Sequence, residues 1–229
     1  MKKGGVIMEL IGYISSVFGI LGTAYGLFQH FYHNQIKFYF FITKLFNRKK
    51  AVKFSVLSRA TIDELDIKSL AKSVRDNYTE SKKVNSSNNS ITINMGDFIA
   101  SINFDDFPAD EFGENFSIEC FVTTTNYKNA INTVDDYIDF CKFIKNKLNI
   151  DSFMYTLTID YSKVKNPYLS ADIGALKSGY IKKLLCVIDT NFISENNIND
   201  EVIISKNKLN FTSKNDIQVY KVAEKFMIV

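Results

Sequence analysis

The histidines are the first side chains of this sequence that could do chemistry. His30 and His33 are the only two, and a spacing of three residues places them on one face of a helix. Imidazoles at this spacing could bind a metal ion or change charge near neutral pH. No carboxylate or cysteine lies near them in the sequence, so the favoured interpretation is that they anchor the chain at a membrane interface.

Two acidic groups are the next candidates. They consist of Asp105, Asp106, Asp110 and Glu111, and of Asp135, Asp136 and Asp139. The first group could bind a hard cation, but its spacing matches no EF-hand loop. The second lies near the start of a predicted helix, where carboxylates favour the helix dipole. We therefore predict no metal site and no cofactor.

One stretch has the residue types that bind phosphate. Glycines allow the backbone to approach closely and lysines neutralise phosphate charge; the residues are Gly174, Lys177, Ser178, Gly179, Lys182 and Lys183. Their order differs from the GxxxxGK[ST] of a P-loop, and the alternative is a basic turn that enters a strand. Lys177, Ser178, Lys182 and Lys183 are the candidate ligand-binding residues.

The cysteines and histidines do not combine into a nucleophilic site. Cys120, Cys141 and Cys186 form no CxxC pair, and each lies in an apolar run. This pattern predicts buried free thiols, which suits a reducing cytoplasm. Because both histidines lie beside the hydrophobic segment, no Ser/His/Asp or Cys/His arrangement can be assembled, and we predict that the protein is not an enzyme.

A hydrophobic segment near the N-terminus must position the histidines. From Leu10 to Ile36 the sequence contains no Asp, Glu, Lys or Arg over 27 residues, whereas a helix needs about 20 residues to cross a bilayer. The sequence therefore predicts an N-terminal transmembrane helix within residues 1–36. A cleaved signal peptide is the alternative, but the apolar run is too long for one and ends in Gln29, His30 and Phe31.

Small residues recur on one face of this predicted helix. They are Gly12, Ser16, Gly19, Gly22, Thr23 and Gly26. Small side chains let helix backbones approach closely, so the pattern predicts self-association, with a polar path through the assembly as a further alternative. The competing interpretation is that Ser and Thr only bond back to their own helix carbonyls.

Basic and aromatic residues follow the segment. The stretch 37–50 contains Lys37, Lys44, Arg48, Lys49 and Lys50 among aromatic residues, while only two lysines precede the segment. We expect these five residues to lie at the membrane interface. The positive-inside rule then places the N-terminus outside and the C-terminal domain in the cytoplasm, in a single-pass protein of the bacterial inner membrane.

Residues 51–229 show the patterns of an α+β domain. Alternating apolar residues and turn signals predict about seven strands in a mixed sheet, and 3.6-residue periodicity predicts two main helices, at about 61–78 and 128–148. The stretch 79–89 is predicted to be a loop, and 218–229 is ambiguous with a preference for a strand. Whether a division near residue 150 creates two domains is left open. This region carries 21 Lys or Arg and 24 Asp or Glu, which argues against a broad nucleic-acid-binding face.

The layout resembles the membrane effectors of bacterial antiphage systems of the CBASS and Hailong types. The resemblance rests on a span rich in small residues (ELIGYISSVFGILGTAYGLF), a basic aromatic collar (KFYFFITKLFNRKK) and an α+β domain without catalytic motifs. It implies a homo-oligomeric effector that forms a gated channel or disrupts the membrane, controlled by a nucleotide, oligonucleotide or protein regulator. The expected partners are membrane lipid, further copies of the chain, such a regulator, and a protein encoded nearby. The alternative is a membrane-tethered protein-binding module, a scaffold or adaptor without pore activity.

Overall fold

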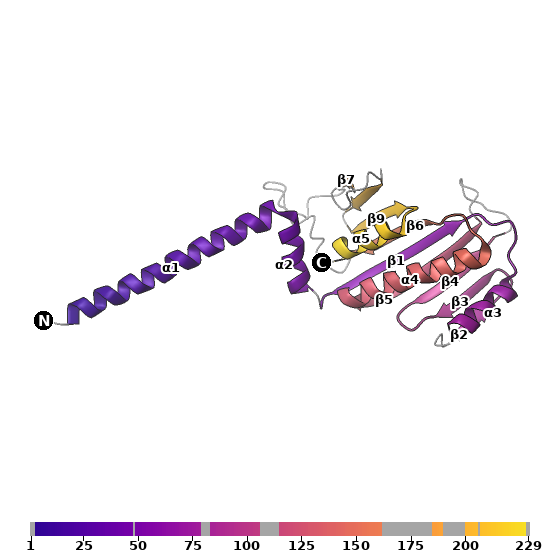
Figure 1. Ribbon diagram of the computed structural model, residues 1–229, viewed down its shortest axis with the longest axis horizontal. Helices are drawn as coiled ribbons and strands as arrows, with labels where there is room; N and C mark the ends of the chain where they lie inside the picture. Colours follow the sequence, from indigo (N-terminus) through magenta and orange to yellow (C-terminus); the bar gives the residue numbers. More distant parts are fainter. Residues whose placement is uncertain are drawn as a thin grey trace. The chain divides into compact units, whose positions relative to one another are not determined.

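The protein divides into two compact units, Met1–Phe46 and Asn47–Val229 (Figure 1). In this computed structural model the structure describes residues 3–47, 49–78, 83–105, 115–161, 185–189, 200–205 and 207–227. The first unit is helical, and the second contains a sheet with helices.

The first unit consists of two helices that meet at a sharp corner. Helix α1 spans Lys3–Asn34 and helix α2 spans Ile36–Asn47. Aromatic rings pack at the corner: the centroid of Phe38 lies 5.6 Å from that of Phe28 and 5.9 Å from that of Phe31. Contacts between rings at these distances are favourable, so this cluster fixes how α2 leaves α1.

The predicted transmembrane helix is not supported. None of the helices in the described part of the chain is long and apolar enough to cross a membrane, so both the membrane span predicted within residues 1–36 and the single-pass location in the inner membrane are wrong. The physical reason lies in the composition of the described helix from Gly12 onward. Glycine, serine, threonine and tyrosine interrupt its apolar residues, and Gln29 and His30 follow, which together lower its mean hydropathy.

The second unit is built on an antiparallel sheet of nine described strands in the order β2-β3-β4-β5-β1-β6-β9-β8-β7. The strands are β1 Ala51–Ala60, β2 Lys83–Ser86, β3 Ser90–Asn94, β4 Ile99–Phe104, β5 Phe116–Asn126, β6 Met154–Asp160, β7 Leu185–Asp189, β8 Glu201–Ser205 and β9 Lys208–Ser213. Strand β1 comes first along the chain but lies in the middle, between β5 and β6.

Three helices cover one face of this sheet (Figure 1). They are α3 Ile67–Asn77, α4 Tyr127–Leu148 and α5 Asp216–Phe226. Alternate strand residues point toward them, so Val52, Phe54 and Val56 of β1 are buried while their neighbours are exposed or half-buried. The hydrophobic core lies between the helices and this face, and α4 contributes the fully buried Tyr137 and Phe140.

Side chains define where the helices begin and end. Asp66 caps α3 by accepting hydrogen bonds from the backbone N–H groups of Lys68 and Ser69. Helix α4 ends at Asn149, whose φ of 52° is left-handed, a conformation that asparagine adopts more readily than most residues. At the far end of the unit, the hydroxyl of Tyr161 donates to the carbonyl of Phe226, which holds the last turn of α5.

The structure is α+β, but several local predictions were wrong. The sheet has nine described antiparallel strands, not about seven in a mixed sheet. Residues 83–86, predicted as part of a loop, form β2, because pairing with β3 compensates for a polar sequence. Helix α3 begins at Ile67 and not near residue 61 as predicted, because Asp66 caps it. The C-terminal segment is helix α5, whose buried Val219, Val222, Ala223 and Phe226 follow a helical period.

Candidate interaction surfaces

The small residues of α1 form a continuous open face. A Cβ atom added at Gly12, Gly19, Gly22 or Gly26 would meet nothing within 4 Å. The hydroxyl of Ser16 donates to the Gly12 carbonyl at 2.9 Å, and that of Thr23 donates to the Gly19 carbonyl at 2.9 Å. Both hydroxyls are thus satisfied within the helix, and this face can pack against an apolar surface without losing a hydrogen bond.

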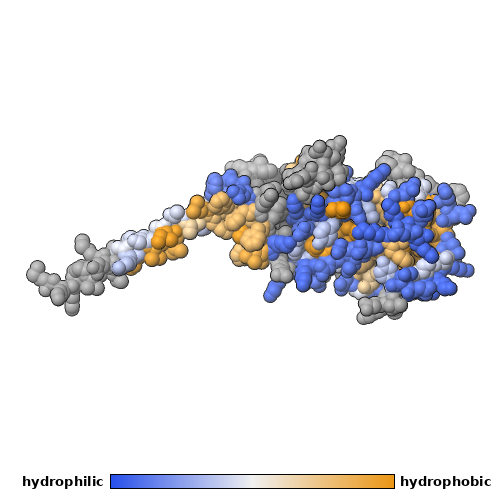
Figure 2. All heavy atoms as spheres, in the orientation of Figure 1, coloured by the Kyte–Doolittle hydropathy of each residue, from blue (hydrophilic) through white to orange (hydrophobic). Residues whose placement is uncertain are grey.

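Large apolar side chains cover the remaining faces of α1. The described ones are exposed and include Tyr13, Ile14, Val17, Phe18, Ile20, Leu21, Tyr25 and Leu27. Tyr13, Phe18 and Ile20 are each at least 70% exposed. Figure 2 shows apolar atoms along the helices of the first unit, while the visible face of the second unit is mostly hydrophilic. Contiguous apolar surface of this size on a protein marks an interaction site.

Only some of the other predicted site residues have described side chains. Lys44, Lys49 and Lys50 are exposed; the side chains of Lys37 and Arg48 lie outside the described residues, as do Lys177, Ser178, Lys182 and Lys183. The imidazole of His30 lies 3.3 Å from the side-chain amide of Asn34. Among the described residues, no group of His, Cys, Asp or Glu could hold a metal ion.

A buried polar cluster joins the sheet to α4. The hydroxyl of Tyr137 donates to the carbonyl of Ile118 at 2.6 Å, and the hydroxyl of Ser58 lies 2.8 Å from that of Tyr137. The thiol of Cys141 lies 3.4 Å from Ser58 Oγ. Burial raises the pKa of Cys141 to about 12 and raises that of Tyr137. Both groups stay protonated at neutral pH, so the cluster holds the core together and offers no nucleophile.

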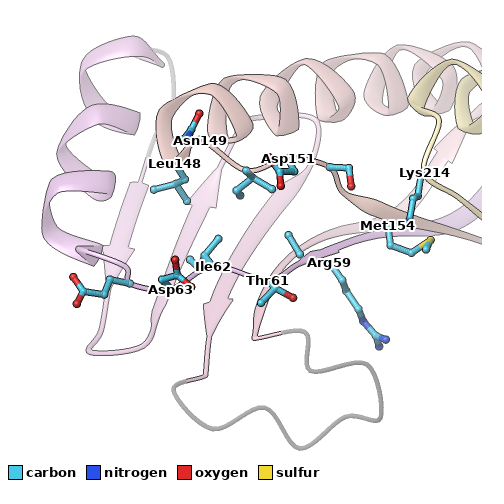
Figure 3. Close-up of a pocket in the computed structure, with 13 residues that line it drawn as sticks. Arg59, Thr61, Ile62, Asp63, Leu148, Asn149, Asp151, Met154 and Lys214 are labelled. Atoms are coloured by element: carbon cyan, nitrogen blue, oxygen red, sulfur yellow. The ribbon is translucent and has the colours of Figure 1, made fainter.

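A polar pocket of about 730 Å³ lies where α4 ends (Figure 3). It is lined by Arg59, Ala60, Thr61, Ile62, Asp63, Glu64, Leu148, Asn149, Ile150, Asp151, Ser152, Met154 and Lys214. The side chain of Asn115 supports one wall, because it accepts from the Ile62 N–H at 2.9 Å and donates to the Ile62 carbonyl at 2.7 Å. Figure 3 shows Arg59 extending away from the other labelled side chains. The described lining contains no histidine or cysteine, so it offers no imidazole base and no thiolate.

The second face of the sheet, opposite the helices, carries a row of residues that runs across seven strands. Paired residues place these side chains next to one another in the order Ile99, Phe121, Ser55, Thr158, Asn210, Ile203 and Val187. We call this set the cross-strand row. Its two ends are apolar: Phe121 and Val187 are each 49% exposed, Ile99 is 44% exposed and Ile203 is 37% exposed. Its centre carries hydroxyl and amide groups, and Thr158 donates to the side chain of Asn210 at 3.1 Å.

Charged residues lie beside the seven residues of the cross-strand row, and the register continues beyond Ile99 to Asn94 and Lys83. Lys53 pairs with Asp160 at 2.9 Å on one side. On the other side, partial burial raises the pKa of Glu119, and the opposing effect of Arg59 is smaller. The row is therefore an uncharged strip of mixed apolar and polar side chains, which is the character of the centre of a protein–protein interface.

Sequence reasoning missed the cross-strand row because pairing across strands decides which residues become neighbours. A local signal does exist. In β5 the inward-facing residues Phe116, Ile118 and Cys120 alternate with polar outward-facing ones, but the outward-facing Phe121 is apolar. An apolar residue at an outward position of a strand indicates that the surface has a further role.

No protein-family model matches this sequence, and no curated protein is significantly similar to it.

Proposed function

We propose that this chain is a non-catalytic, self-associating binding protein whose sheet domain recognises a partner protein through the cross-strand row. The exposed apolar ends of that row carry the proposal, since Ile99 and Phe121 occupy outward positions where a solvated sheet face would carry polar residues. Adaptor or effector activity would follow from bringing several copies of the partner together.

The chemistry of the row favours a protein over a nucleic acid. The seven residues of the row include no cation, although the register continues beyond Ile99 to Asn94 and Lys83; residues 51–229 carry more acidic than basic groups, whereas nucleic-acid sites gather many Lys and Arg on one face. A regulatory nucleotide, which the likeness to antiphage effectors implies, would need cationic groups that the row does not contain. The pore suggested by that likeness depended on the transmembrane helix and is not part of this proposal.

The proposed role of α1 is to assemble copies of the chain. Its small residues allow two backbones to approach closely, and its exposed aromatic and aliphatic side chains would be removed from water in a bundle. Because exposed aromatic and aliphatic side chains lie beside the small-residue face, α1 gains most from several neighbours, and we expect an assembly larger than a dimer.

Site-specific photocrosslinking tests the partner surface. Phe121 is replaced by p-benzoylphenylalanine in the full chain in bacteria, and the control carries the same group at Ile217, which is 60% exposed on α5. We expect a discrete adduct with one protein from position 121 and none from position 217. Adducts that are the same at both positions, or absent from both, would contradict the proposal.

A matched pair of substitutions then measures the contribution of the row. Phe121→Ser should weaken binding of the crosslinked partner by at least about 30-fold, as expected for an aromatic anchor residue. Ile217→Ser, which removes a similar apolar group from the helical side, should leave binding within about twofold. Equal losses in the two variants would show that the row has no specific role.

A further inference from the structure

A carboxylate lies on the same face of the sheet as the cross-strand row. Glu119 is a half-buried residue of β5, and it alternates with the inward-facing Ile118 and Cys120, as Phe121 does. Residues two apart on one strand point to the same face and lie about 7 Å apart. A partner that covers Phe121 therefore also covers Glu119, and what we infer for Glu119 rests on the proposed function.

The residues that lie directly across from Glu119 are uncharged. Leu57 of β1 is its pairing partner on one side, and Ser101 of β4 is its partner on the other. The Cβ atoms of directly opposed residues in such a sheet lie about 5 Å apart. With Phe121 on its own strand, Glu119 is therefore next to two apolar side chains and one hydroxyl group.

Arg59 is the nearest cation in register among the described residues of this face. It follows Leu57 by two residues on β1 and so lies diagonally from Glu119. Lys53 lies further away on β1 and pairs with Asp160 at 2.9 Å. Strand β4 and the rest of β5 contain no charged residue, and the described helices cover the opposite face (Figure 1). In the described part of the chain, the charged surroundings of Glu119 are therefore chiefly one diagonal arginine.

Burial makes the charged form of Glu119 less favourable. Partial burial already raises the pKa of its carboxyl, and Arg59 opposes this with a smaller effect. A partner on this face removes more water, and a carboxylate without water needs either a cation or a proton. A cation brought by the partner would itself be buried against Leu57 and Phe121, and an ion pair often fails to offset that loss of water. A proton removes the charge without burying a second one.

We propose that partner binding is linked to the uptake of a proton by Glu119, so that the sheet face binds its partner more tightly as the pH falls. In the free chain at pH 8 the carboxylate is ionised and hydrated. On binding, a proton from the solvent is added to a carboxylate oxygen, and the neutral carboxyl is buried beside Phe121. Because the complex favours the protonated form, the affinity is greatest below the pKa of the free carboxyl. It falls as the pH rises from there toward the higher pKa of the bound carboxyl.

Titrations at several pH values test the proposal. The probe is the protein captured by photocrosslinking at position 121, purified and titrated against the full unmodified chain between pH 5 and pH 8. We expect the affinity at pH 5 to be at least about tenfold greater than at pH 8, which corresponds to a difference of one between the bound and free pKa of a single group. Calorimetry in buffers of different ionisation enthalpy should show net proton uptake. Equal affinity at both pH values, or weaker binding in acid, would overturn the proposal.

Glu119→Gln assigns the effect to this carboxyl. Glutamine has the shape of a protonated glutamate, so the variant should bind at least about tenfold more tightly than the unmodified chain at pH 8 and lose most of the pH dependence. Glu64→Gln is the matched control, because it removes the same charge from an exposed position between β1 and α3. The control should keep the affinity and the pH profile of the unmodified chain. A pH profile that persists in Glu119→Gln would assign the proton to another group and contradict the proposal.

Failure of proton uptake is distinguishable from failure of the proposed function. A discrete adduct at position 121 together with pH-independent binding retains the partner surface and removes the role of Glu119. If Glu119→Gln weakens binding by more than about tenfold, the partner supplies a cation to the carboxylate, and the partner surface stands while proton uptake does not. Absence of any adduct at position 121 rejects both.

Discussion

The two units of this protein place similar side chains in opposite locations. In the sheet domain, Phe54, Phe140 and Phe211 are at most 3% exposed, whereas in the helical unit Phe18, Phe41 and Phe46 are at least 62% exposed. Composition is therefore a poor guide to the role of a segment. A sheet with helices on one face buries its own apolar residues, but two helices that meet at a corner cannot do so. The helical unit therefore exposes an apolar surface that can contact another molecule, whereas the sheet domain buries its own hydrophobic core.

Separating the units should give the largest effect. We expect residues 47–229 alone to be monomeric and to unfold cooperatively, whereas the full chain associates through α1. Sedimentation velocity and a thermal melt of both proteins measure this difference. Gly19→Leu with Gly26→Leu in the full chain should reduce association, because the added side chains hold neighbouring backbones apart.

Ala24→Leu is the matched control for that variant, since it adds a side chain to the opposite side of α1. It should leave the oligomer intact. Association of residues 47–229 as strong as that of the full chain would contradict the division of roles between the units, and an intact oligomer in the double glycine variant would remove the small-residue face from the interface.

Truncating one phenylalanine in each unit sharpens the comparison. Phe140→Ala should destabilise the sheet domain by about 3–5 kcal/mol, because the side chain is fully buried and leaves a cavity. Phe46→Ala should change the stability by at most about 0.5 kcal/mol, because the ring is largely exposed. Urea denaturation of the full chain, monitored through the tyrosines, measures both changes. Equal losses would mean that Phe46 is buried in solution.

Thiol chemistry should divide the cysteines by location and pH. Cys186 is exposed, whereas Cys120 and Cys141 are buried, so a thiol reagent at pH 8 should label one cysteine in the folded protein and three after denaturation. Burial raises the pKa of Cys141 from 9.0 to about 12 and also raises that of Cys120. Above pH 9 the unfolded chain releases these protons while the folded chain keeps them, so stability is fully present below pH 9 and is lost as the pH rises toward 12.

Urea titrations between pH 8 and pH 11 measure this loss, and Cys141→Ala provides the comparison. The variant is expected to be less stable at pH 8 but to show a smaller decline at high pH. Rapid labelling of more than one thiol in the folded protein would mean that the core opens more readily than its burial indicates.

The smallest effect should come from a helix cap in the sheet domain. Asp66→Ala removes the acceptor of two backbone N–H groups at the start of α3 and should destabilise the domain by about 1 kcal/mol. Asp66→Asn keeps an acceptor oxygen and should recover most of that loss. The ratio of folded to unfolded protein in urea distinguishes the two, and equal destabilisation would show that the charge, and not the cap, is what α3 requires.

Much of the sheet domain could be predicted from its sequence, because its elements are marked by local patterns. Alternating residues predicted β1 and β5, and the apolar stripe of α4 predicted its span to within one residue at its start. Helix α5 was missed because a short amphipathic segment gives few periods to count. The transmembrane prediction rested on the length of an uncharged run, and it was wrong: no helix in the described part of the chain is long and apolar enough to cross a membrane.

The candidate surfaces were predictable to different degrees. The small-residue face of α1 is periodic along one helix and could be identified directly in the sequence. The cross-strand row could not, because Phe121 becomes a neighbour of Ser55 and Ile99 only through strand pairing. Residues far apart in the chain meet through topology, and no local pattern gives the order of nine strands.

The central position of β1 also sets the timing of events during synthesis. This strand ends at Ala60, but its partners β5 and β6 begin at Phe116 and Met154. At about 5–20 residues per second, the ribosome takes roughly 5–20 s after β1 to deliver β6. Throughout that interval the apolar helices have already been made while the sheet is incomplete. The nascent chain therefore exposes the apolar N-terminal helices well before the domain that follows them can fold. During this interval the chain most needs a chaperone.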